Sequence, residues 1–200
     1  MKKVLVLDFG GQYNLLVARR VRECGVYCEI KSFRMSMEEI RAFAPDALIF
    51  TGGPATVFEP NAPMVDKARF EMGIPVLGIC YGEQLMMHLL GGQCRKAETR
   101  EYGKVELTHK ASPLFDGVPE KAVYWMSHGV EVESLAPGFE IIGSTEGCLH
   151  AAVQSADKKL YGVQFHPEVL HTEYGTQILK NFLYTICGFG PEWTMASYME

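Results

Sequence analysis

The sequence contains no apolar stretch that approaches the roughly 20 residues needed to cross a lipid bilayer. It also lacks a basic excess, and its net charge of -5 argues against nucleic acid as the main partner. No internal repeat, low-complexity tract or linker interrupts the chain before about Gly188. With 200 residues, 48% of them hydrophobic, one compact domain is the simplest organisation.

Two further absences concern metals and export. The six cysteines include no CxxC pair, and no cluster of histidine and cysteine has the spacing of a zinc site, so we expect no metal. The apolar N-terminal segment is interrupted at Asp8, and no small-residue cleavage site follows it. We therefore interpret this segment as a first β-strand, and we expect a cytoplasmic protein with reduced thiols.

The first half of the chain alternates strand and helix patterns. Apolar runs predict strands over residues 3–7, 27–30, 47–50 and 75–79, and helical spacing predicts helices over residues 13–24, 36–44 and 64–72. The second helix begins with the capping-box pattern of Ser36 and Glu39. Repeated β-α-β units with apolar strands predict an α/β fold, in which helices cover both faces of a mostly parallel central sheet.

The second half has short strand patterns with little helix between them. Strands are predicted over residues 105–107, 123–126, 139–142, 151–154 and 160–165, and a closing amphipathic helix over residues 172–187. This pattern predicts a smaller antiparallel β section beside the parallel sheet. Residues 1–188 would form the domain. Residues 189–200 would form a tail that either packs on the domain or leads into a further one, because Trp193 would otherwise expose apolar surface.

Cys80 lies where a predicted strand runs into a helix-like segment, with Gly78 and Gly82 on either side. Glycines at these positions allow a turn too tight for side chains, and such a turn lifts a nucleophile clear of the sheet. The amides that begin the following helix would favour thiolate over thiol. The alternative is a buried cysteine in an ordinary turn; the two glycines favour the nucleophile.

A cysteine nucleophile requires a base and a group that orients this base. His166 directly follows a strongly apolar strand, and Glu168 lies two residues further on, beyond Pro167. A carboxylate at that position would fix the tautomer of the imidazole and stabilise the imidazolium. The alternative is a plain turn at the end of a strand. We predict a catalytic triad of Cys80, His166 and Glu168.

Two glycines also end the third predicted strand, at residues 52–53. Backbone amides can approach a ligand closely there, so the amides of Gly53 and Tyr81 would form an oxyanion hole for a tetrahedral intermediate. A plain Gly-Pro turn is the alternative. Among the remaining histidines, His128 lies at a strand end beside Gly129 and is a candidate for substrate binding.

Four segments together resemble the class I, or triad-type, glutamine amidotransferases. In chain order they are Gly52-Gly53-Pro54, Gly78-Ile79-Cys80-Tyr81-Gly82-Glu83-Gln84, Ser127-His128-Gly129 and Gly162-Val163-Gln164-Phe165-His166-Pro167-Glu168. Segments at residues 7–13, 18–23, 125–129 and 171–175 are similar to the glutaminase domains of GMP synthetases. The resemblance extends from residue 3 to about 195, and the catalytic segments occur in the family's order and approximate spacing.

The resemblance implies a flavodoxin-like fold and glutamine hydrolysis. Cys80 would attack the side-chain amide of glutamine, His166 would protonate the departing ammonia, and a γ-glutamyl thioester would be hydrolysed to glutamate. The residues implied to bind glutamine are Gly82, Gln84, Ser127, His128 and Gly129. The ammonia would pass to an ATP-pyrophosphatase domain absent from these residues, which aminates XMP to GMP with ATP and magnesium. No cofactor is expected in the present domain.

Two positions depart from the family pattern. Glu83 lies where the family has an apolar or amide side chain, and its charge would slow attack if it faced the sulfur of Cys80. We expect it to point away, because successive helical residues diverge by about 100°. Val130 occupies a position where GMP synthetases commonly carry an aspartate, which puts in doubt the contacts made there to substrate or to a partner domain.

Two other functions fit the same residues. One is the glutaminase component of another pathway, such as anthranilate or carbamoyl phosphate synthesis, which Tyr81 and the Trp125-Met126 pair disfavour only by resemblance. The other is a catalytically silent docking module that keeps the fold. Covalent labelling of Cys80 by a glutamine-like electrophile would separate this module from an enzyme.

Overall fold

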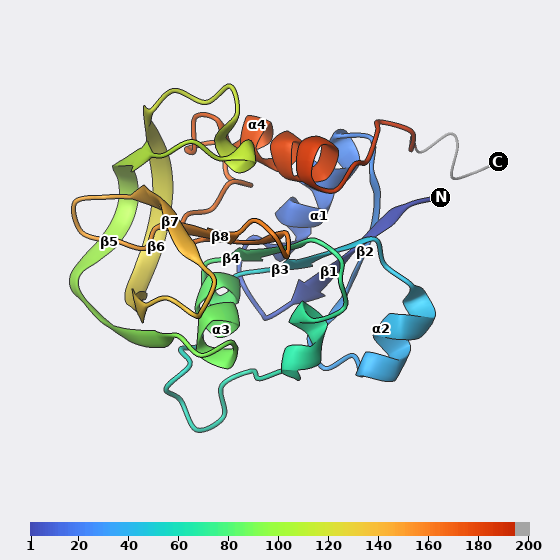
Figure 1. Ribbon diagram of the computed structural model, residues 1–200, viewed down its shortest axis with the longest axis horizontal. Helices are drawn as coiled ribbons and strands as arrows, with labels where there is room; N and C mark the ends of the chain where they lie inside the picture. The colour runs from blue at the N-terminus through green and yellow to red at the C-terminus, as the bar shows by residue number, and fades with distance from the viewer. Residues whose placement is uncertain (195–200) are drawn as a thin grey trace.

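The computed structural model describes residues 1–194, and residues 195–200 of the predicted tail lie outside this description (Figure 1). Within it, the strands form one sheet in the order β2-β1-β3-β4-β9-β8-β7-β5-β6. The first five strands of this order are parallel: β2 (Tyr27–Ser32), β1 (Lys3–Asp8), β3 (Ala47–Phe50), β4 (Val76–Ile79) and β9 (Leu160–Val163). The predicted parallel section is therefore confirmed, and its order is that of flavodoxin-like folds.

The other four strands pair antiparallel: β8 (Ala152–Ser155), β7 (Glu140–Ser144), β5 (Gln93–His109) and β6 (Lys121–Ser134). The predicted antiparallel section is confirmed, but the strands predicted at 105–107 and 123–126 are much too short. They are parts of β5 and β6, which have 17 and 14 residues. Charged side chains on the exposed face of this ribbon hide its strand pattern, because strand propensity scales favour β-branched and aromatic residues.

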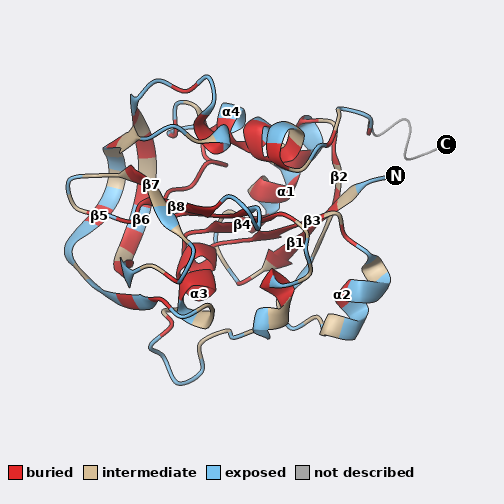
Figure 2. Cartoon of the chain, in the orientation of Figure 1, coloured by how far each residue is buried: buried red, intermediate tan, exposed pale blue. Residues whose placement is uncertain are grey.

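Helices cover both faces of the sheet, as Figures 1 and 2 show. Helix α1 (Asn14–Glu23) and helix α4 (Gly175–Lys180) contribute to the core layer that contains Val4 and Val6 of β1, whereas α2 (Met37–Phe43) and α3 (Tyr81–Leu89) contribute to the layer that contains Leu5 and Leu7. This division follows from the two-residue period of a strand, which sends successive side chains to opposite faces. The buried apolar side chains lie in these two layers.

Two helix predictions need correction. The helix expected at 64–72 is a single 3₁₀ turn, Lys67–Phe70, begun by the Asp66 side chain and followed by Gly73 at φ 76°. Too few of its side chains face the core to sustain a longer helix. The closing helix begins at Gly175, three residues later than expected, and continues as a π-helical segment, Asn181–Ile186.

The described part of the tail packs on the domain. The Trp193 amide donates to the Gly25 carbonyl at 2.8 Å, and the Trp193 ring lies 5.9 Å from that of Tyr27. The domain boundary at residue 188 stays a prediction. Among the described residues, no helix has the length and apolar character needed to cross a membrane.

The strand order decides where a ligand can bind. In an open parallel sheet, the crevice lies beyond the carboxyl ends of the strands, where the order reverses. Residues 52–53 follow β3, Cys80 follows β4, and His166 lies just beyond β9, so all three predicted catalytic segments meet at this edge.

Candidate active site

The predicted nucleophile turn is present at Cys80. Its backbone has φ 55° and ψ -109°, a strained conformation for a residue with a side chain. A Cβ atom at Gly78 would lie 2.7 Å from the backbone of Gly82, and one at Gly82 would lie 2.5 Å from the Phe50 carbonyl oxygen. Only glycine fits at both flanking positions, so the turn holds Cys80 at the carboxyl edge of the sheet.

The structure brings Cys80, His166 and Glu168 together. Nδ1 of His166 lies 2.7 Å from Oε1 of Glu168, and the imidazole and Cys80 line the same cavity and both lie close to Gly52. Burial lowers the pKa of His166, but the hydrogen bonds with Cys80 and Glu168 outweigh it and raise the pKa to about 10. The imidazole is therefore protonated at neutral pH beside the sulfur, and it can act as a proton donor.

A side-chain amide also contacts the sulfur, and this contact was not predicted from the sequence. The fully buried Gln164 donates from Nε2 to Sγ of Cys80 at 3.5 Å, and its Oε1 accepts from Nε2 of Gln84 at 3.1 Å. Nε2 of Gln84 also donates to the Val130 carbonyl at 3.0 Å. A carbonyl can only accept, so this bond fixes the orientation of both amides. The sequence signal that could have indicated this role is Gln164 itself, an amide side chain within the apolar run before His166.

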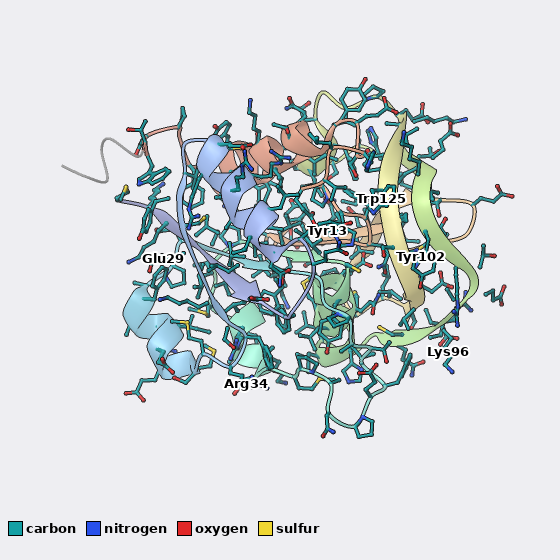
Figure 3. All side chains as sticks on the ribbon, turned by 180° about the vertical axis from the view of Figure 1, so that it is seen from behind. Tyr13, Glu29, Arg34, Lys96, Tyr102 and Trp125 are labelled. Atoms are coloured by element: carbon teal, nitrogen blue, oxygen red, sulfur yellow. The ribbon has the colours of Figure 1, made fainter. Side chains whose placement is uncertain are left out.

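The loop that carries His166 is anchored from several elements. Thr172 Oγ1 donates to the His166 carbonyl at 2.7 Å and accepts from the Trp125 amide at 2.9 Å. Arg20 of α1 donates from Nε to the Glu168 carbonyl at 3.0 Å. The Tyr13 ring, labelled in Figure 3, meets the His166 ring edge-on at 5.5 Å. These contacts fix the imidazole against Cys80.

Two cavities, of about 420 and 330 Å³, share Cys80 in their walls. The predicted oxyanion residues Gly53 and Tyr81 both line the larger one. Tyr81 is the first residue of α3, so its amide has no acceptor within the helix. Its hydroxyl donates to the Pro63 carbonyl at 2.7 Å, and burial raises the pKa of the phenol to about 12. Only the backbone of Tyr81 is therefore suited to an oxyanion hole.

The predicted glutamine-binding residues divide into two groups. Gln84, Ser127 and Gly129 line the larger cavity with Cys80. Gly82 lines neither cavity near Cys80 and instead packs against the Phe50 backbone. The role of Gly82 is thus to permit the turn.

His128 also lines the larger cavity, but its imidazole is already engaged. Nδ1 faces the Val130 carbonyl at 3.2 Å, and Nε2 faces Oε1 of Glu101 at 2.9 Å. Both ring nitrogens are therefore engaged with protein atoms, so His128 could contribute to glutamine binding only through its backbone.

Glu83 is fully buried, which the sequence reasoning did not foresee. Its exposed fraction is 0%, both carboxyl oxygens lack a hydrogen-bond partner, and its Cγ would lie 2.8 Å from a Cβ at Gly162 of β9. The side chain thus lies against the sheet. Burial, reinforced by the charge of Cys80, raises the pKa of Glu83 well above its ordinary value, which favours the neutral acid.

Three residues from distant segments form the one cluster in the described part of the chain that could hold a metal ion. Glu101, His128 and Cys148 each place one ligand atom within 4.8 Å of the others. The contact of 2.9 Å between His128 Nε2 and Glu101 Oε1 is a hydrogen-bond distance that needs no metal, and Thr145 Oγ1 donates to the other Glu101 oxygen at 2.8 Å. The expected absence of a metal stays a prediction.

Comparison with known proteins gives the family. The model of the glutamine amidotransferase class-I family matches residues 5–186. The glutamine-hydrolysing GMP synthases of Caldicellulosiruptor saccharolyticus and Acetivibrio thermocellus are 57% and 55% identical to this chain over 198 residues. These matches cover 98% of this chain and 39% of each relative, so the chain spans well under half of their length.

Solved structures agree with this result. A protein from Thermoplasma acidophilum, described as a GMP synthase subunit, has a TM-score of 0.82 and 29% identity, covering 100% of this chain and 96% of its own. A glutamine amidotransferase from Thermotoga maritima, at 17% identity and a TM-score of 0.72, covers 94% of this chain and 99% of its own and shows the fold alone. The chain belongs to the class-I glutamine amidotransferase family.

Proposed function

We propose that this domain hydrolyses glutamine to glutamate and ammonia through Cys80, His166 and Glu168. The observation that carries the proposal is the buried imidazole of His166, which contacts Glu168 through Nδ1 and shares the cavity wall with Cys80. This arrangement fits a cysteine nucleophile with an oriented acid and base. A silent docking module would need no such strained turn at Cys80.

The first half of the reaction forms the thioester. The sulfur of Cys80 attacks the side-chain amide carbon of glutamine, and the amides of Gly53 and Tyr81 stabilise the resulting oxyanion. The C–N bond then breaks as protonated His166 gives its proton to the leaving nitrogen, which departs as ammonia. A γ-glutamyl thioester remains on Cys80, and the imidazole of His166 is neutral.

The second half restores the enzyme. Neutral His166 takes a proton from water as the water oxygen attacks the thioester carbon, and the C–S bond breaks to release glutamate. Cys80 leaves as the thiolate beside the protonated imidazole, which is the starting state. Glu168 holds Nδ1 of His166 throughout, so the other ring nitrogen stays aimed at the reacting atoms.

We further propose that the ammonia serves the amination of XMP to GMP on an ATP-pyrophosphatase domain that uses ATP and magnesium. The support is the name of the two GMP synthases compared above and the 39% of their length that this chain spans. These relatives also favour GMP synthesis over the anthranilate or carbamoyl phosphate pathways.

Covalent labelling tests the triad. A diazoketone analogue of glutamine should modify Cys80, as located by mass spectrometry, and glutamine should protect it. Cys80→Ala should abolish the adduct, whereas the matched change Cys187→Ala, at a half-buried thiol outside both cavities, should leave it intact. Failure of the wild-type protein to react at any concentration would refute the catalytic proposal.

Isotope transfer tests the acceptor. Protein that also carries the ATP-pyrophosphatase domain is supplied with amide-¹⁵N glutamine, XMP, ATP and magnesium. We expect ¹⁵N in GMP, and we expect Cys80→Ala to abolish glutamine-dependent but not ammonium-dependent synthesis. Labelled ammonia without labelled GMP would leave the glutaminase proposal intact and refute the assigned acceptor.

A further inference from the structure

Three buried side chains from separate segments meet in the interior of the antiparallel section. Glu101 comes from β5, His128 from β6 and Cys148 from the loop between β7 and β8, and their exposed fractions are 7%, 4% and 1% (Figure 1). One ligand atom of each residue lies within 4.8 Å of the other two. Glu101 and Cys148 line neither cavity near Cys80, so the cluster is distinct from the proposed glutamine site.

The contacts of His128 direct a lone pair toward Glu101. The Val130 carbonyl, 3.2 Å from Nδ1, can only accept, so the proton of a neutral imidazole lies on Nδ1 and the lone pair on Nε2. Nε2 lies 2.9 Å from Oε1 of Glu101, and an ionised carboxylate can also only accept. Two buried acceptors at this distance require a cation between them, which is either a proton or a metal ion.

The outer contacts of the cluster are those of metal ligands. A metal-binding histidine usually donates its other ring nitrogen to a backbone carbonyl or a carboxylate, as Nδ1 of His128 does, and ligating carboxylates are themselves hydrogen-bonded. Oε2 of Glu101 accepts from Thr145 Oγ1 at 2.8 Å, which leaves Oε1 facing the cluster. Gly147 lets the loop approach, because a Cβ atom there would lie 3.2 Å from the same Oε2.

We propose that Glu101, His128 and Cys148 bind a zinc ion that fastens the loop between β7 and β8 to β5 and β6. Thiolate, imidazole and carboxylate are the ligands of protein zinc sites, and the thiolate disfavours magnesium and calcium. Zinc bonds of about 2.0–2.3 Å at tetrahedral angles place ligand atoms roughly 3.3–3.6 Å apart. Each side chain therefore needs to move by less than about 1 Å.

The exchange of protons for zinc leaves the charge of the buried cluster unchanged. Zn²⁺ replaces the proton between His128 and Glu101 and the thiol proton of Cys148, so two protons leave as two positive charges enter. Three protein ligands leave the fourth tetrahedral position to a water molecule. The expectation of no metal came from spacing along the chain, which does not reveal ligands that only the fold brings together.

Metal binding to the Cys80→Ala variant tests the proposal. This variant removes the active-site thiol, which would otherwise offer the metal a second thiolate beside an imidazole. One Co²⁺ ion per chain should bind with a thiolate-to-cobalt absorption band, and Zn²⁺ should displace it. Zn²⁺ at a hundredfold excess over its Kd should raise the Tm by about 5–10 °C.

Further substitutions in the Cys80→Ala background assign the ligands. Cys148→Ala should abolish the cobalt band, whereas Cys94→Ala, at a buried thiol outside the cluster, should leave it intact. Glu101→Gln, whose amide can still bond to His128 and Thr145, should weaken Co²⁺ binding at least tenfold. Circular dichroism checks that each variant is folded, and Glu101→Gln decides the outcome if Cys148→Ala is not.

Two results would overturn the inference. One is a Cys80→Ala protein that shows neither a cobalt band nor a zinc-dependent Tm. The other is a band of undiminished strength and affinity in folded Cys148→Ala or Glu101→Gln. The inference does not rest on the glutaminase function, because the thiol of Cys80 is absent from every protein tested.

Discussion

Replacing Glu83 by glutamine or methionine should stabilise the domain, and the gain should increase with pH. The side chain is 0% exposed, and neither carboxyl oxygen has a hydrogen-bond partner. A buried polar group left unpartnered costs about 1–3 kcal/mol of the free energy of unfolding. Methionine removes this cost. Glutamine keeps an unpartnered polar group, the amide, and removes only the ionisable carboxyl group and the pH dependence that it causes. We therefore expect Glu83→Met to be the more stable of the two variants.

The pH dependence follows from the raised pKa of Glu83. Burial raises this pKa well above the ordinary value of 4.5, so the folded protein keeps a proton that the unfolded chain loses above that pH. The contribution of Glu83 to stability is fully present below pH 4.5 and is lost as the pH rises toward the folded-state pKa. Within this window the loss is about 1.4 kcal/mol per pH unit.

Urea unfolding at closely spaced pH values, starting just above pH 5, measures this slope. The wild type should lose about 1.4 kcal/mol per pH unit relative to Glu83→Gln until the folded-state pKa is reached. Glu106→Gln, at an exposed glutamate of β5, is the matched control and should follow the wild type. Parallel pH profiles for wild type and Glu83→Gln, or a Glu83→Met variant less stable than the wild type, would refute the reasoning.

Three further predictions concern the site. Glu168→Gln should lower the pKa of His166 from about 10, as followed by NMR titration of its ring, and should reduce glutaminase activity about 100-fold; an unchanged ring titration would contradict the assigned contact. Gly82→Ala should cost about 3 kcal/mol in urea unfolding, because its Cβ would overlap the neighbouring strand, and wild-type stability would show that the turn can relax. Thr172→Val should cost about 1–3 kcal/mol by leaving the Trp125 amide unpartnered, whereas Thr172→Ser, which keeps the hydroxyl, should cost less.

Local sequence signals were sufficient for the parallel half of the fold. The apolar runs that became β1, β3 and β4 needed no partner to be recognised, because strands buried on both faces are apolar almost throughout. The capping box of Ser36 and Glu39 begins α2 as predicted. The glycines around Cys80 predicted the turn correctly. The steric requirement at Gly78 is local, because its Cβ would meet the backbone of Gly82, whereas the requirement at Gly82 comes from the Phe50 backbone of the neighbouring strand.

Elements with exposed faces were predicted less well. Many side chains of β5 are charged, so its composition does not indicate a strand. It forms a strand of 17 residues because it pairs with β6 along most of its length. The segment at 64–72 has helical spacing, but few of its side chains reach the core, so only one 3₁₀ turn forms. Tertiary packing decided both outcomes.

The sequence by itself therefore determined the nucleophile turn, the alternation of strands and helices, and the candidates Cys80, His166 and Glu168. Only the tertiary structure decided that Gln164 donates to the sulfur and that Glu83 is buried without a partner. The physical reason is that these residues are far apart along the chain. A shift of one residue in the strand register, or a different strand order, would place their side chains on another face or at another edge of the sheet. Which groups meet at the carboxyl edge of the sheet is a property of the folded topology, and no local pattern encodes it.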